Sequence, residues 1–434
     1  MTIRRFPRSR QSTIPYPATL DLSFLGRDTL DPRITFTRAD ATTCATYFDS
    51  VGVLRTAAAN VPRFDYNPST LAAQGLLIEE SRTNGLRNNT MVGAVAGTPG
   101  TLPTNWAAQI NTTTGLTISV IGTGTENGIT YIDIRVNGTA SGAGSLDVFL
   151  ENANGVAALT GQTWTGSVYT KLQSGSLTGI STPTFRLYEY TSGIVFVTAQ
   201  SGAIATPTTA NLATQRTSAT LTTTGGATTA SIRPLINYAI ANGVAIDITL
   251  RIGLPQLELG AFATSVIPTT TTALTRAADV ASVNTLSPWY NATEGTLFAE
   301  AVYFGLSAST TVAANTIRFF DGTGSNAISL RTVIGTGSAS ADEVIVASGV
   351  TYMDTTGITA TTNTTYKRAI AYSTNNARAA INGAYTDPAD TTVTIPVVTS
   401  LSFGFAGSFY GMYLRRISYY PRKLSDAELQ TLTT

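Results

Sequence analysis

The chain has 434 residues, more than one hydrophobic core usually organises, so we expect two or three domains. Charged residues make up only 12%, and 27 Lys and Arg nearly cancel 26 Asp and Glu, which leaves no long-range field to attract nucleic acid or an anionic membrane. The sequence has no histidine, the commonest general base and metal ligand, and its single cysteine, Cys44, excludes an intrachain disulfide.

The first residues are basic, with Arg4, Arg5, Arg8 and Arg10 and no apolar run behind them. This pattern predicts an extended arm, neither a signal peptide nor a membrane-inserted segment. Short β-favouring runs follow, among them ITFTRAD, ATYFDSVGVLRT and GLLIEESRTN, and turn pairs separate them. We therefore expect residues 1–95 to form a β-rich attachment region that contacts a partner.

Residues 96–272 contain many short segments with alternating hydrophobicity, such as TYIDIRV, FRLYEY and IVFVTA. Clusters of Gly, Asn and Ser separate them at the spacing typical of an all-β sandwich. About eight antiparallel strands of this kind predict a jelly roll. The Thr-rich phrase IPTTTTAL then suits an extended linker.

Residues 273–434 give a second set of strands. NNARAAINGAY places Asn-Gly between two apolar arms, which predicts a β-hairpin. After the strand-like FYGMYLRRISYY, Ser425 and Glu428 fit a capping box, and Leu424 and Leu429 fit a hydrophobic staple. The predicted fold class is all-β: two consecutive antiparallel sandwiches after the N-terminal region, closed by a short C-terminal helix.

Three phrases resemble the modular virion proteins of tailed bacteriophages, which carry tail-fibre, head-fibre or spike functions. These are FTRADATTCATYFDSVGVLRTAAANVPRFDY with GLLIEESRTN, then PQLELGAFATSVIPTTTTALTRAADV, then the stretch from SPWYNATEGTLFAEAVYF to YLRRISYYPRKLSDAELQTL. The second is similar to the exit of a carbohydrate-binding-module-like jelly roll, and the third to a concanavalin-like or laminin G-like sandwich. The resemblance implies a structural virion component with lectin-like folds, and no binding residue carries over from the family.

Aromatic side chains are the first candidates for a sugar site, because sugars stack on flat apolar faces beside amide or carboxylate groups. Trp164 lies in a strand-like run, and the alternation of that run predicts that its side chain packs in the core. Trp106 lies in the loop-like TLPTNWAAQ, which makes it the candidate for an exposed stacking surface. Trp289 and Tyr290 follow Ser-Pro at the start of a domain, and they are the remaining candidates. For Trp289, packing into the end of the sandwich is an equally good interpretation.

Catalytic and metal-binding residues are not indicated. Two adjacent acidic pairs, Glu79 with Glu80 and Asp342 with Glu343, are candidates for a glycosidase. Neighbours on a strand point to opposite faces and do not converge on one bond. The DGTGSN phrase lacks the bidentate acid of a calcium loop, so we expect no cofactor and no metal. Cys44 has no histidine to activate it, and we expect it to be a small buried residue.

The function expected from the sequence is a structural protein on the surface of a virion, displaying lectin-like domains for adhesion to host-surface glycan. We expect a homo-oligomer, trimer first and dimer second, whose N-terminal region binds other virion proteins. Two alternatives remain open: an architectural decoration protein without ligand, and a polysaccharide-degrading tail enzyme.

Overall fold

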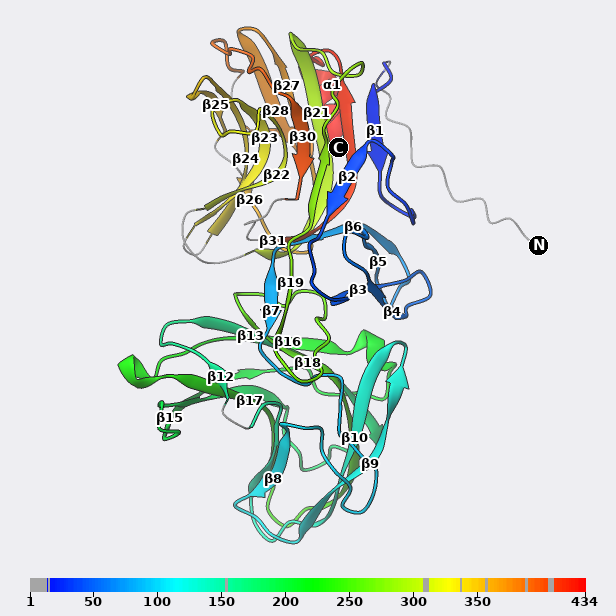
Figure 1. The fold of residues 1–434 in the computed structure, drawn as a ribbon, viewed down its shortest axis with the longest axis vertical. Coiled ribbons are helices and arrows are strands. Elements are labelled where there is room, and N and C mark those ends of the chain that lie inside the picture. The colour runs from blue at the N-terminus through cyan, green and yellow to red at the C-terminus, as the bar shows by residue number, and fades with distance from the viewer. Residues whose placement is uncertain are drawn as a thin grey trace, which may run out of the picture. The chain divides into compact units, whose positions relative to one another are not determined.

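A computed structural model describes residues 14, 16–152, 155–306, 312–335, 338–355, 358–386, 389–404 and 410–434. The expected basic arm lies almost entirely outside these residues. The chain divides into two compact units (Figure 1). We call residues 38–73 and 81–278 the central unit, and the described parts of 1–37, 74–80 and 279–434 the terminal unit. The predicted all-β fold class is confirmed.

Two antiparallel sheets form a jelly-roll-type sandwich in the central unit. One sheet has the order β16–β13–β18–β10–β9, and the other the order β15–β14–β17–β11–β8, with β12 beside β17. The strands are β8 (Ala107–Asn111), β9 (Leu116–Glu126), β10 (Ile129–Thr139), β11 (Gly144–Phe149), β12 (Val156–Ala157), β13 (Thr163–Ser174), β14 (Thr184–Tyr190), β15 (Phe196–Ala203), β16 (Arg216–Thr222), β17 (Ser231–Ile240) and β18 (Ala245–Leu259). Two 3₁₀ turns, Leu212–Thr214 and Gly226–Thr228, join strands.

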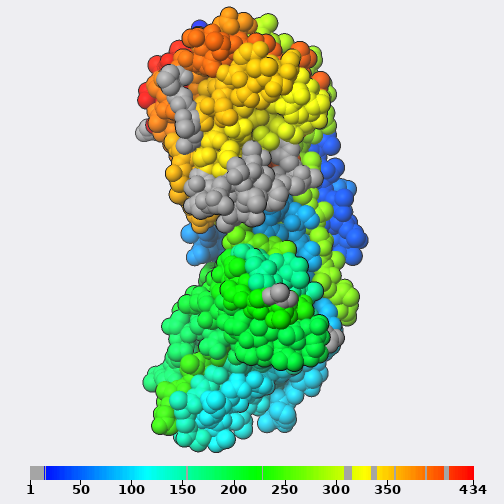
Figure 2. Space-filling model, turned by 90° about the vertical axis from the view of Figure 1, so that its left-hand side faces the viewer, coloured from blue at the N-terminus to red at the C-terminus, as the bar shows by residue number. Residues whose placement is uncertain are grey.

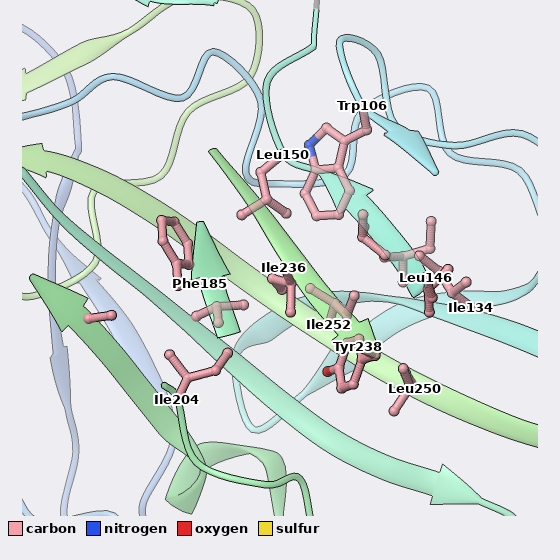
Figure 3. Packing of buried hydrophobic residues seen from close by; sticks show 14 of the residues in the cluster. Trp106, Ile134, Leu146, Leu150, Phe185, Ile204, Ile236, Tyr238, Leu250 and Ile252 are labelled. Atoms are coloured by element: carbon pink, nitrogen blue, oxygen red, sulfur yellow. The ribbon is translucent and has the colours of Figure 1, made fainter. Parts of the chain in front are cut away.

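The inner faces of these two sheets meet in one hydrophobic core. Phe185 and Ile236 of one sheet pack against Leu250 and Ile252 of the other, and all four are buried (Figure 3). Because alternate side chains of each strand point inward, the remaining side chains line the two outer faces. In the space-filling view the cyan and green segments of this unit close into one body (Figure 2).

Residues 38–73 and the segments near 81 and 275 complete the central unit. They contribute β3 (Ala45–Phe48), β4 (Leu54–Ala57), β5 (Phe64–Tyr66), β7 (Arg82–Asn84) and β19 (Leu274–Arg276). β3 pairs with β4, and β7 with β19. The predicted Thr-rich linker begins packed rather than extended: Thr269 is buried and its N–H donates to Asn89 Oδ1 at 2.7 Å.

The terminal unit is a second sandwich. One sheet runs β29–β28–β27–β21–β31–β6, with β1 also on β31, and the other runs β2–β20–β30–β22–β23–β24–β25, with β26 on β24. The strands are β1 (Leu20–Ser23), β2 (Ile34–Thr37), β6 (Ala73–Glu79), β20 (Val280–Val283), β21 (Glu294–Leu306), β22 (Val312–Phe320), β23 (Ala327–Gly335), β24 (Ser338–Ala347), β25 (Val350–Asp354), β26 (Ile358–Thr359), β27 (Thr365–Ser373), β28 (Asn376–Ile381), β29 (Ala384–Tyr385), β30 (Ser400–Phe403) and β31 (Tyr410–Tyr420).

Strands from the two ends of the sequence share the sheets of this sandwich. Leu20 pairs with Tyr419, and Ile34 pairs with Val283. Residues 1–95, which the sequence suggests as one attachment region, therefore divide: β1, β2 and β6 serve the terminal unit, and 38–73 serve the central unit.

Local predictions at the C-terminal end are confirmed. Asn382 and Gly383 both have positive φ between β28 and β29, as an Asn-Gly hairpin turn requires. Helix α1 (Asp426–Thr433) begins at Ser425 with a complete capping box to Glu428. Among the described residues, no helix has the length and apolar character needed to cross a membrane.

Candidate functional site

The outer face of the sheet β15–β14–β17–β11–β8 carries aromatic side chains on the solvent side. In β14, Phe185 and Leu187 point into the core and are fully buried, whereas Arg186, Tyr188 and Tyr190 alternate with them and are half-buried. Because alternate side chains of a strand point to opposite faces, the two tyrosine rings lie on the outer face and outside the core.

Four rings, which we call the aromatic row, follow one another across this face: Phe149, Tyr188, Phe196 and Tyr190. Successive ring centres lie 5.8, 5.5 and 5.9 Å apart, and each pair meets edge to face. Phe149 is buried, Tyr188 and Tyr190 are half-buried, and Phe196 has 53% of its surface exposed. The row thus offers apolar ring surface to solvent while its rings hold one another in place.

Beside the aromatic row lies a group of hydrogen-bonding side chains, the amide cluster: Gln109, Asn111, Ser145, Asp147 and Asn237. Asp147 stands opposite Gln109 on β8 and Asn237 on β17. Its carboxylate accepts from Asn111 Nδ2 at 2.6 Å, from the Ser145 hydroxyl at 3.2 Å and from Asn237 Nδ2. Gln109 is exposed, so its amide faces solvent at the end of the cluster.

Two arginines lie on the same face as the rings, and one of them contacts a ring. Arg233 of β17 stands opposite Tyr188, and its guanidinium carbon lies 4.4 Å from the centre of the Tyr190 ring. Arg186 stands opposite Leu235, and its Nε donates to Thr184 Oγ1 at 3.1 Å. The face therefore combines rings, amides and cations across the five strands β15, β14, β17, β11 and β8.

The acid of β14 points away from this face. Burial raises the pKa of Glu189, but hydrogen bonds from the N–H groups of Thr224 and Gly225 and from the side chains of Thr229 and Gln200 outweigh it and lower the pKa below its ordinary value. Glu189 is thus ionised and held on the inner side of the sheet, where it cannot neutralise Arg186 or Arg233.

The predicted exposure of Trp106 is wrong. Its side chain is 7% exposed, packs in the central core and donates from Nε1 to the Asn88 carbonyl at 2.8 Å (Figure 3). The loop folds back because the indole contributes a large apolar area to the core and its N–H finds a backbone acceptor there.

Trp289 and Tyr290 belong to the terminal unit, whereas the aromatic row belongs to the central unit. Trp289 is 6% exposed, and its Nε1 donates to the Thr285 carbonyl at 3.0 Å. Tyr290 is half-buried and stacks on Tyr419 with ring centres 5.4 Å apart. Trp289 also lies 5.9 Å from the Phe319 ring centre, so it packs inside the terminal unit and offers little surface for stacking.

A cavity of about 610 Å³ opens elsewhere in the central unit. Its lining is largely apolar and includes Trp164, Val156, Leu259, Arg82 and Arg87. Both cations already bind protein groups: Arg82 Nη1 donates to the Leu259 carbonyl at 2.5 Å, and Arg87 pairs with the buried Glu151 at 2.5 Å. The predicted burial of Trp164 is confirmed at 6% exposure.

The acidic pairs considered for glycosidase chemistry are buried. Glu79 and Glu80 are 1% and 7% exposed, and Asp342 and Glu343 are 5% and 0% exposed. Glu343 Oε1 pairs with Arg368 at 2.9 Å between the two sheets of the terminal unit. Within the described residues, no three His, Cys, Asp or Glu side chains come together in a way that could hold a metal ion.

Tyr188, Tyr190 and Phe196 are not among the residues that the sequence analysis predicts for the sugar site. The signal was present in FRLYEY: its alternation places Phe185 and Leu187 on one face and the tyrosines on the other. The contribution of Arg233 and Asp147 depends on strand pairing across about 50 to 90 residues, which the sequence pattern does not specify.

No family model and no curated protein matches the chain. Among solved structures, a Trypanosoma rangeli sialidase matches at 10% identity and TM-score 0.28, over 95% of this chain and 93% of that one. The tandem CBM22-1–CBM22-2 domain from Paenibacillus barcinonensis Xyn10C matches at 10% identity and TM-score 0.24, over 77% and 98%.

The binding domain of botulinum neurotoxin serotype D matches at 11% identity and TM-score 0.27, over 36% of this chain and 39% of that one. In a complex of the Trypanosoma rangeli sialidase with 2,3-difluoro-KDN, the chain spans 25% of the neighbour's length. Likenesses of this size carry no argument about function. The feature that bears on function is the outer sheet face, which presents aromatic rings beside amides.

Proposed function

We propose that the chain is a display protein that binds glycan through the aromatic row and the amide cluster. The observation that supports this most directly is the exposed Phe196 in ring contact with Tyr188 and Tyr190 on a sheet face. Sugar rings carry C–H groups that stack on such apolar surface, while their hydroxyls need the donors and acceptors that Gln109 and Asn111 supply.

An open sheet face of this kind binds weakly, because little of the ligand is desolvated. Several copies on one particle compensate, since the first bound site raises the effective concentration of the next. The need for several copies supports the homo-oligomer expected from the sequence. We propose a trimer, with a dimer as the second choice.

The setting we propose is the surface of a tailed-phage virion, with host-surface glycan as the ligand. Its support is the sequence resemblance in residues 36–66 and 75–84 and in the two later phrases. Segments before residue 95 would contact other virion proteins in this proposal.

The experiment is an array of bacterial-surface glycans probed with the full chain and two variants. Phe196→Ala removes an exposed ring and should weaken binding about tenfold. Ile121→Ala is the matched control, because Ile121 is 44% exposed in the same unit but lies on β9 of the other sheet. Its binding should equal that of the unchanged chain.

Two results would overturn the proposal. Absence of binding to every glycan on the array would favour the purely architectural role. Equal losses in Phe196→Ala and Ile121→Ala would remove the aromatic row as the site. A scattering mass of one chain at all concentrations would separately reject the oligomer.

A further inference from the structure

We infer that the glycan bound by this face is acidic, meaning that its sugars carry carboxylate groups. The inference rests on the proposed function and adds the ligand's chemical class. Two cations, Arg186 and Arg233, lie on the same sheet face as the aromatic row, on adjacent strands β14 and β17.

The two guanidinium groups are close enough to act on one ligand. Arg186 of β14 pairs in register with Leu235 of β17. Arg233 lies two residues before Leu235 on β17, so its side chain is on the same face. Diagonal neighbours of this kind have Cα atoms about 7–8 Å apart. Both side chains are half-buried, so they border solvent while their stems pack on the sheet.

Neither cation has a carboxylate partner among the described residues. Arg186 has one hydrogen bond there, from Nε to Thr184, and Arg233 has a long one of 3.4 Å from Nη1 to Asn152 Oδ1. The Nε of Arg233 is buried and has no hydrogen-bond partner in that part of the chain. As far as the described residues go, their donor capacity is therefore largely unused.

The acids nearest in the sheet do not neutralise these charges. Glu189 is held on the inner side, and Asp147 is 2% exposed and already accepts from three side chains. The outer face of the opposite sheet differs: Arg251 is paired with Asp133 at 2.8 Å and Arg135 with Asp247 at 2.8 Å. Among the described residues, Arg186 and Arg233 thus lack the carboxylate partners that Arg251 and Arg135 have.

A guanidinium presents parallel N–H donors that match the two oxygens of a carboxylate. Arg233 also lies over the Tyr190 ring, which limits the directions its donors can take. A sugar stacked on Phe196 or Tyr188 would bring a ring carboxylate toward these donors, where low-polarity rings strengthen the charge interaction.

The experiment compares uronic-acid and sialylated oligosaccharides with their methyl esters, which keep the sugar rings and hydroxyls but lose the charge. Binding of the full chain is measured by titration calorimetry. The acids should bind at least about tenfold more tightly than the esters. Raising NaCl from about 50 mM to about 500 mM should weaken the binding of the acids several-fold and leave the binding of the esters unchanged.

Arg186→Gln and Arg233→Gln should each remove most of the preference for the acid, and Arg135→Gln, which also deletes one positive charge from the central unit, should retain it. Equal binding of acids and esters would overturn the inference and leave the proposed glycan function standing. A loss in Arg135→Gln as large as in Arg186→Gln would also overturn it, because net charge alone would then explain the preference. No binding of any oligosaccharide would overturn both.

Discussion

The guanidinium carbon of Arg233 lies 4.4 Å from the centre of the Tyr190 ring, and Arg233 stands opposite Tyr188 across β14 and β17. This contact joins the charged and the aromatic parts of the sheet face. Because the two strands are paired over seven residues in register, the cation and the rings keep their relative positions without a ligand. Such preorganisation reduces the entropy that binding would otherwise cost.

Asp147 should matter for stability as well as for the face. Asp147→Ala leaves the buried amide of Asn237 without its acceptor, which should lower the free energy of unfolding of the central unit by roughly 1–3 kcal/mol. Asp247→Ala is the control: its side chain is 63% exposed in an ion pair with Arg135, and its loss should leave the stability nearly unchanged. Urea unfolding measures both, and equal effects would contradict the assigned role of Asp147.

Gly166 tests how tightly the two sheets of the central unit pack. A Cβ at this position would overlap the ring of Phe185 from the facing sheet, so Gly166→Ala should destabilise the unit by about 1–3 kcal/mol. Gly142→Ala adds the same methyl group where nothing lies within 4 Å. Calorimetric melting should show a lowered transition only in Gly166→Ala; an unchanged transition there would mean that the core is looser than described.

Glu343 should make the terminal unit less stable as pH rises. Burial raises its pKa to about 7, against the lowering effect of Arg368 and of the Thr355 hydroxyl. Because the folded chain keeps this proton to higher pH than the unfolded chain, the stabilisation is complete below about pH 4.5 and is lost as pH passes 7.

Denaturation at pH 5 and pH 8 should therefore differ by about 1–3 kcal/mol more in the unchanged chain than in Glu343→Gln, which cannot titrate. The same pH dependence in both chains, or greater stability of the unchanged chain at pH 8, would assign the effect to other groups.

Cys44 should be unreactive in the folded chain. The residue is fully buried, and burial, with a smaller effect from Asp40, raises the pKa of its thiol to about 11, so almost no thiolate exists at pH 8. A maleimide followed by mass spectrometry should label Cys44 only in denaturant. Val51→Cys introduces a second thiol at a position that is 64% exposed, and that thiol should react within minutes. Equal rates for the two thiols would contradict the buried position.

The sequence pattern was sufficient where short-range chemistry decides the structure. Period-two alternation predicted strands, Asn382-Gly383 predicted a hairpin, and Ser425 with Glu428 predicted the start of α1. Pairings over hundreds of residues, such as Leu20 with Tyr419, could not be predicted because alternation specifies a face but not a partner strand.

The same limit explains the candidate site. Trp106 has a loop-like sequence, yet the free energy of burying an indole outweighs local preference. Tyr188 and Tyr190 belong to a strand whose outward face could be recognised, but the neighbours that make it a site, Arg233 and Asp147, come from other strands.

The location of the ligand on the chain tests the central claim most directly. Hydrogen–deuterium exchange of the full chain, with and without the tightest oligosaccharide from the array, should show slowed exchange in residues 184–203 and 231–240, which hold Tyr188, Tyr190 and Phe196 of the aromatic row and both cations. Protection confined to residues 81–87 and 155–164 around the Trp164 cavity, or to the terminal unit, would contradict it.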